Sequence, residues 1–157
     1  MNEICGLLGS RYPLIQGAMG VICNPEMVAA VSEAGGYGLL ASAFLTEPGP
    51  LREQIEAVKR LTDKPFGANL MAMNPMSIAF AEVLIENGIK TVTTSAGSPK
   101  ELLSILKPAG VKVLHVVPNV ETAPRQKMPV WMPLLRRGVS RVVSRAIWGL
   151  QPWCWFP

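Results

Sequence analysis

Short apolar runs alternate with amphipathic segments through most of the chain. In the amphipathic segments, apolar residues recur three or four positions apart, which is typical of helices packed on one face. The clearest case has Leu51, Ile55, Val58 and Leu61 on one helical stripe. The predicted strands cover residues 12–16, 38–41, 65–70, 91–94 and 111–117, and the predicted helices cover residues 25–34, 46–61, 75–87 and 99–107.

Residues that favour helix ends flank these segments. Asn24 is a favourable N-cap before Pro25, and Thr46 and Ser98 are the expected caps of two later helices. Glycines follow the predicted helices at positions 35–36, 88 and 110. Regular strand–helix alternation with short connections predicts a parallel α/β sheet, either an open doubly wound sheet or a (β/α)8 barrel.

Small and polar residues gather where the predicted strands end, which is where both architectures place their sites. They are Gly17–Met19, Asn69, residues 95–97 and residues 118–119. Glycine allows backbone amides to approach a flat or phosphorylated ligand closely. Asn69 has two readings, a ligand contact or a side chain satisfied by local backbone. The only histidine, His115, lies within a strand, where a structural role is expected.

Several classes of function find no support. Cys5, Cys23 and Cys154 have no metal-ligand spacing and no disulfide framework, which favours reduced thiols in the cytoplasm and no metal site. The sequence 35–38, Gly-Gly-Tyr-Gly, is not a dinucleotide fingerprint, since it precedes a strand. The first residues have no basic region followed by a long apolar stretch, so no signal peptide is expected, and the sequence has no apolar run of membrane-spanning length.

The charge composition changes abruptly after Ala123. Residues 1–123 hold all eleven acidic residues and nine basic ones, whereas residues 124–157 hold six basic residues, all four Trp and no acid. The overall charge of +4 therefore comes from the tail alone. A basic balance confined to one end does not form a nucleic-acid-binding face, so no nucleic-acid partner is expected.

Five ordered motifs in residues 1–123 resemble the nitronate monooxygenase family, formerly called 2-nitropropane dioxygenases. This family includes the FMN-dependent enoyl-acyl-carrier-protein reductases. The motifs are Tyr-Pro-Leu-Ile-Gln-Gly-Ala-Met-Gly (12–20), Ala-Gly-Gly-Tyr-Gly-Leu-Leu-Ala (34–41), Thr-Asp-Lys-Pro-Phe-Gly-Ala-Asn-Leu-Met (62–71), Thr-Thr-Ser-Ala-Gly-Ser-Pro (93–99) and Val-Val-Pro-Asn-Val (116–120). The resemblance implies an FMN-binding TIM barrel, of which this chain would supply about four and a half βα units.

The resemblance also implies a set of site residues. Gly17, Ala18 and Met19 would lie against the flavin, Asn69 would hydrogen-bond it, and Ala96 and Gly97 would line the site. The expected substrate is a small molecule, either an alkyl nitronate oxidised with oxygen or an enoyl thioester reduced with NAD(P)H. The motif at 93–99 leans towards the enoyl reductase branch. The catalytic residue stays unassigned, because the family's histidine belongs to a downstream Gly-Gly-His motif that this sequence lacks.

Two hypotheses address residues 124–157, which do not follow the family pattern and are expected to be irregular. In the first, deletion of one base after the codon of Ala123 turns a reading of Ala-Arg-Lys-Ala-Glu-Asp-Ala into the observed residues 123–129. The chain is then a partial barrel, 1–123, with an out-of-frame tail. It would have open edges at its first and fifth strands and would bind FMN weakly or not at all. In the second, a non-catalytic α/β fragment carries a basic, Trp-rich tail that binds a membrane surface.

Overall fold

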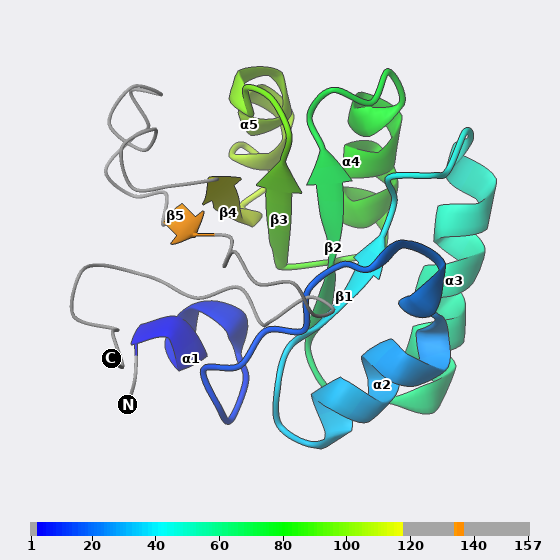
Figure 1. The fold of residues 1–157 in the computed structure, drawn as a ribbon, viewed down its shortest axis with the longest axis vertical. Coiled ribbons are helices and arrows are strands. Elements are labelled where there is room, and N and C mark those ends of the chain that lie inside the picture. The colour runs from blue at the N-terminus through cyan, green and yellow to red at the C-terminus, as the bar shows by residue number, and fades with distance from the viewer. Residues whose placement is uncertain (1–2, 118–133, 137–157) are drawn as a thin grey trace, which may run out of the picture.

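The alternation of strands and helices predicted from the sequence is confirmed. The computed structural model describes residues 3–117 and 134–136. Five parallel strands form one sheet in the order β1-β2-β3-β4-β5 (Figure 1). The elements are α1 (Glu3–Leu8), η1 (Gly20–Ile22), α2 (Pro25–Glu33), β1 (Gly38–Ala41), α3 (Pro48–Leu61), β2 (Phe66–Met71), α4 (Ser77–Glu86), β3 (Thr91–Ser95), α5 (Lys100–Leu106), β4 (Lys112–Val117) and β5 (Leu134–Arg136).

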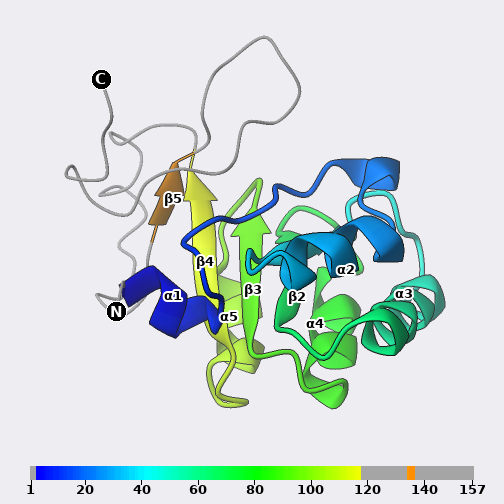
Figure 2. The same ribbon diagram turned by 90° about the horizontal axis from the view of Figure 1, so that it is seen from below.

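The two faces of the sheet are packed differently. One face is covered by α2, α3, α4 and α5, which contact one another in sequence order and bury strand residues such as Leu40, Leu70 and Val92. The other face holds a smaller apolar cluster, in which Leu39 and Leu114 pack with Leu8 of α1. Figure 2 shows α1 beside β4, away from α3 and α4. In a (β/α)8 barrel, the face opposite the outer helices is the interior face.

The predicted first strand, residues 12–16, is reduced to one parallel bridge between Ile15 and Tyr37. Tyr37 N–H donates to Leu14 O at 2.8 Å, and Gln16 N–H donates to Tyr37 O at 3.0 Å. Pro13 has no N–H with which to lengthen the ladder before this point. The bridge still places the following residues, Gly17 onward, beside β1.

Helix α1 was not predicted, and three predicted helix starts differ from the structure. Helix α3 is capped by Glu47 rather than Thr46, with Pro48 as its first residue. Helix α4 begins at Ser77, since Asn74 first forms a turn in which its Oδ1 accepts from Met76 N–H at 2.8 Å. Helix α5 begins at Lys100, with Pro99 rather than Ser98 at the cap. The Asn24 cap is confirmed: its side chain accepts from Met27 N–H at 2.9 Å.

Strand β5 changes one expectation about the sheet. The strand over residues 111–117 was expected to be an open edge, yet His115, Val116 and Val117 pair in parallel with Leu134, Leu135 and Arg136. A short strand therefore lies within the range expected to be irregular. In the described part of the chain, no helix is long and apolar enough to cross a membrane.

Candidate functional site

A row of polar side chains crosses the sheet near the carboxyl ends of its first three strands. Asn69 is the centre of this row: its Nδ2 donates to Ser95 Oγ at 3.1 Å, and its Oδ1 accepts from Thr93 Oγ1 at 2.9 Å. Ser42, directly after β1, donates to Asn69 O at 2.7 Å. The side chain of Asn69 is partly buried and is oriented by two neighbouring hydroxyl groups. The Asn69 side chain thus bonds to hydroxyl groups of β3 and not to its local backbone, while a ligand contact of Asn69 stays a prediction.

The segment Gly17–Met19 leaves the sheet after the Ile15 bridge. All three residues are partly buried, and a Cβ added at Gly17 would have no neighbour within 4 Å. Gln16 joins this segment to β1, because Leu39 N–H donates to Gln16 Oε1 at 3.2 Å. Gly17–Met19 therefore flank β1, while Asn69 lies on the next strand, β2.

The loops after β2 and β3 are hydrogen-bonded to each other beyond the sheet. Ala72 N–H donates to Ser95 O at 2.8 Å, and Met73 N–H donates to Ala96 O at 3.0 Å. Ala96 has a φ of 51° and Gly97 a φ of 122°. The φ of Gly97 favours a glycine, and an added Cβ there would meet Met73 Cγ at 3.0 Å, so the Met73 side chain would have to shift. Ala96 and Gly97 are exposed at this edge.

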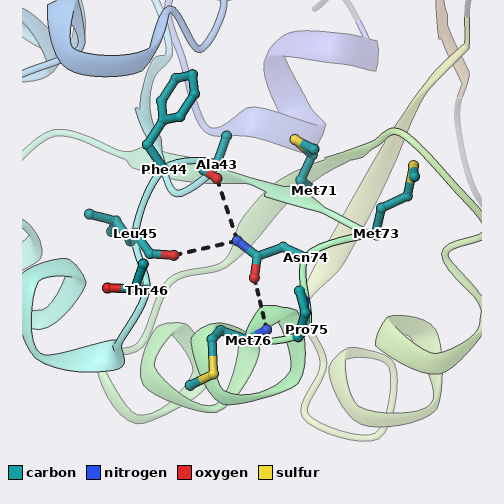
Figure 3. Close-up of a pocket in the computed structure, with 9 residues that line it drawn as sticks. All are labelled: Ala43, Phe44, Leu45, Thr46, Met71, Met73, Asn74, Pro75 and Met76. Atoms are coloured by element: carbon teal, nitrogen blue, oxygen red, sulfur yellow. Dashed lines mark hydrogen bonds between the residues drawn. The ribbon is translucent and has the colours of Figure 1, made fainter.

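An open pocket of about 520 Å³ lies between the loops that follow β1 and β2 (Figure 3). Asn74 spans it: its Nδ2 lies 3.5 Å from both Ala43 O and Leu45 O, and its Oδ1 holds Met76 N–H. These bonds fix the two loops to one another. The pocket is lined by Ala43, Phe44, Leu45, Thr46, Met71, Met73, Asn74, Pro75 and Met76.

Large apolar side chains are exposed at the same edge of the sheet. Val21 is 90% exposed, Phe44 78% and Met73 71%. Such a concentration of exposed apolar groups marks a surface that binds a ligand or another surface. The sequence pattern missed this feature, because loop residues carry no periodicity from which exposure can be predicted.

The edge offers no acid–base pair among the residues described. His115 is buried and its Nδ1 is 2.9 Å from Thr94 Oγ1. Thr94 pairs with Leu70 in the register of β2 and β3, so Thr94 and His115 lie on the face that the helices cover. The described residues also contain no group of His, Cys, Asp or Glu suited to a metal ion.

The structure thus places Asn69 in β2, bonded to β3, Ala96 and Gly97 in the loop after β3, and Gly17–Met19 beside β1. Residues 118–119, also named from the sequence, lie outside the described residues. Sequence reasoning did not single out Gln16, Ser42 or Thr93. Each is a polar residue at or next to the end of an apolar run, which is the signal that could have identified them.

A family model described as "Nitronate monooxygenase" matches residues 2–128. A (3aS,4S,5R,7aS)-5-hydroxy-7a-methyl-1-oxo-octahydro-1H-indene-4-carboxyl-CoA dehydrogenase of Rhodococcus jostii is 36% identical over 121 residues, which are 77% of this chain and 33% of that protein. A probable nitronate monooxygenase of Staphylococcus saprophyticus is 26% identical, covering 78% of this chain and 44% of its own length. The chain therefore spans less than half the length of these curated relatives.

Solved structures give the same picture of the fold. FabK from Thermotoga maritima is 35% identical and superposes with a TM-score of 0.73 over 80% of this chain and 40% of its own. A nitroalkane oxidase from Streptomyces ansochromogenes, 21% identical, superposes with a TM-score of 0.71 over 87% of this chain and 48% of its own. The sheet described above is part of a TIM-barrel fold.

Proposed function

Because the chain belongs to the nitronate monooxygenase family, we propose that residues 3–117 supply the ring-contacting part of an FMN site in an oxidoreductase. The single observation that carries this proposal is the edge described above. There, Thr93 and Ser95 orient the amide of Asn69, and the neighbouring loops carry residues with little or no side chain. An added Cβ at Gly17 would meet nothing within 4 Å, and Ala96 and Gly97 are exposed, so a flat ring could approach the backbone at these positions.

The residues fit the ring of FMN better than its phosphate. Asn69 would offer a hydrogen-bonding amide oriented by Thr93 and Ser95, and Gly17–Met19 would lie against the ring. In barrels of this kind, phosphate sites are commonly built by the loops after the seventh and eighth strands, which lie beyond the strands described here. A bound flavin would supply the hydride-transfer chemistry, while the protein binds and orients the reactants.

The substrate we favour is an enoyl thioester with an apolar acyl group, which would be reduced with NAD(P)H as the co-substrate. The pocket of Figure 3 supports this choice, since seven of its nine lining residues are apolar and none is charged. Its lining includes Met71, Met73 and Met76, and flexible methionine side chains adapt to irregular apolar groups. The name of the Rhodococcus relative, a carboxyl-CoA dehydrogenase, also favours a thioester.

Oxidation of an alkyl nitronate with oxygen is the second candidate. It is supported by the description of the family model and by the staphylococcal relative named as a probable nitronate monooxygenase. A small nitronate would contact few of the residues that line the apolar pocket. The two candidates therefore differ in how strongly activity depends on the pocket residues.

A chimera tests both the cofactor and the substrate. Residues 3–117 of this chain would replace the matching segment of Thermotoga maritima FabK, to which the chain is 35% identical. We expect the purified chimera to retain flavin absorbance and to consume NAD(P)H with an enoyl thioester. Flavin absent from a folded chimera would contradict the cofactor proposal. Oxygen uptake with an alkyl nitronate, without thioester turnover, would favour the second candidate.

For residues 124–157 the proposal is an out-of-frame tail that takes no part in function. The support is the loss of acidic residues after Ala123 and the end of the family match at residue 128. The nucleotide sequence across codons 120–130 is the test, with a barrel reading frame one base away as the expected result. Liposome binding that disappears when 124–157 is deleted would instead favour the membrane-surface tail.

A cytoplasmic location completes the proposal. Cys5 and Cys23 are buried free thiols, which suits a reducing compartment.

A further inference from the structure

The segment from Gln16 to Cys23 has no partner strand to fix it. Backbone pairing with the strand region ends at the Gln16 N–H bond to Tyr37 O, after which Gly17 turns away from β1. A segment outside the sheet ladder that contains a glycine loses conformational entropy on ordering. Its backbone bonds in η1, from Ile22 N–H to Met19 O and from Cys23 N–H to Gly20 O, are supplemented by side-chain hydrogen bonds.

The Gln16 side chain takes the place of the missing peptide group. Its Oε1 accepts from Leu39 N–H at 3.2 Å, and its Nε2 lies 3.4 Å from Leu39 O, so the amide lies against the backbone of β1. The same Nε2 donates to Gly17 O at 2.6 Å and to Cys23 Sγ at 2.9 Å. One side chain thus connects β1 to both ends of the segment.

Cys23 closes the segment from the other end. Its sulfur accepts from Met19 N–H at 2.8 Å and from Gln16 Nε2, and its S–H donates to Gly17 O at 3.4 Å. The side chain is only 3% exposed. Gly17, Met19, Cys23 and Gln16 therefore form one closed set of hydrogen bonds, which we call the 16–23 clamp.

We infer that Gln16 and Cys23 are positioning residues, which hold the backbone of Gly17–Met19 in the conformation that faces the flavin. The inference rests on the proposed function for the identity of the ligand, whereas the clamp itself rests on the contacts above. A loop fixed before binding loses less entropy when its ligand arrives. Because the two residues act through the backbone of the loop, neither one has to contact the flavin.

Two roles of Cys23, packing alone and hydrogen bonding, predict different effects of replacing it with serine or alanine. A serine at position 23 keeps an acceptor for Met19 N–H but loses apolar volume, whereas an alanine loses the acceptor. If Cys23 only fills space, Cys23→Ser and Cys23→Ala would loosen the loop alike. If Cys23 acts by hydrogen bonding, the loop should stay ordered in Cys23→Ser and become looser in Cys23→Ala.

The test is residue-resolved hydrogen exchange on the full 157-residue chain. In Cys23→Ala we expect the Met19 amide to exchange roughly fivefold faster or more, the equivalent of one ordinary hydrogen bond, and in Cys23→Ser to remain near the wild-type rate. Equal rates in the two variants would overturn the inference.

Gln16→Leu provides a second test with a matched control. It should speed exchange at both Leu39 and Met19 and raise the rate at which iodoacetamide alkylates Cys23, measured on the Cys23 peptide. The control is Gln54→Leu, since Gln54 Oε1 in α3 is buried without a hydrogen-bond partner and its loss removes no such contact. Gln16→Leu that behaves like Gln54→Leu would overturn the inference.

FMN titration separates the clamp from the cofactor proposal. If the wild-type chain binds FMN, Gln16→Leu and Cys23→Ala should weaken binding roughly fivefold or more while Cys23→Ser does not. Unchanged affinity in all variants would show that the clamp does not position the flavin loop. If the wild-type chain shows no saturable FMN binding, the cofactor proposal fails for this chain, and the exchange rates alone decide whether the clamp exists.

Discussion

At the scale of single residues, Ala96 is a candidate site residue whose backbone conformation is unfavourable. In the described part of the chain it is the one non-glycine residue with positive φ, 51°, and its carbonyl holds the loop after β2 through Met73 N–H. An alanine in the left-handed region costs about 1–2 kcal/mol, which a glycine avoids at some cost in chain entropy. Strain of this kind is often stored at ligand sites.

We therefore expect Ala96→Gly to raise the free energy of unfolding by about 0.5 kcal/mol, since relief of strain exceeds the added entropy cost. Urea denaturation measures the change. Ala30→Gly is the control, because Ala30 lies exposed in α2 and should lose about 1 kcal/mol there. Losses of the same size in both variants would show that Ala96 is not strained.

Tyr37 makes the free energy of unfolding depend on pH in the alkaline range. Burial raises its pKa well above the usual 10.0, and its hydroxyl donates to Thr91 O at 2.7 Å. The folded chain thus holds this proton at pH values where the unfolded chain releases it. The stabilisation is fully present below the unfolded pKa and is lost as the pH rises from there towards the folded pKa.

The free energy of unfolding should therefore decrease above about pH 10. In Tyr37→Phe this decrease should be less steep than in the wild type over the same range. At neutral pH the variant should lose about 1 kcal/mol with the hydrogen bond to Thr91. Urea midpoints measured against pH give both values. Tyr12→Phe is the control, because Tyr12 is 42% exposed and should follow the wild-type curve. Parallel curves for wild type and Tyr37→Phe would contradict this assignment.

At the scale of elements, α1 is held to the interior face of the sheet by its last turn. Lys112 Nζ and Thr91 Oγ1 donate to Leu7 O at 3.2 and 3.1 Å, and Leu8 is buried in the cluster with Leu39 and Leu114. Leu8→Ala should cost about 2–4 kcal/mol, as expected for a buried leucine, while Leu61→Ala, at a half-exposed site, should cost much less. Equal urea midpoints for the two variants would mean that α1 adds little to the core.

The elements differ in how far the sequence predicted them, for physical reasons. Strands β1–β4 and helices α2–α5 carry apolar periodicity, so their existence was predictable. Helix α1 has six residues, too few for a periodic signal, and it is held by tertiary contacts with Thr91 and Lys112. At the site, Asn69 was found because a polar residue ended an apolar run. The bonds from Gln16 to Leu39 and Cys23 depend on chain geometry that no local pattern contains.

At the scale of the whole molecule, the described sheet is one sector of a barrel. Helices α2–α5 cover one face, the first edge is the single Ile15 bridge, and the last edge is covered by β5 at three positions. The residues proposed to contact the flavin ring come from β2, the loop after β3 and the segment before β1. A ligand held by this sector alone would lack the contacts that the remaining strands of a closed barrel provide.

We therefore expect a polypeptide of these 157 residues to bind FMN at least tenfold more weakly than the FabK chimera, because charge-assisted bonds to a phosphate are each worth about 1.5–3 kcal/mol. Quenching of flavin fluorescence measures both affinities. Riboflavin, which lacks the phosphate, is the matched ligand. The 157-residue chain should bind FMN and riboflavin about equally, whereas the chimera should prefer FMN, because the downstream segments would supply the phosphate contacts. A monodisperse, yellow 157-residue protein that prefers FMN would contradict the prediction and place phosphate-binding groups within this chain.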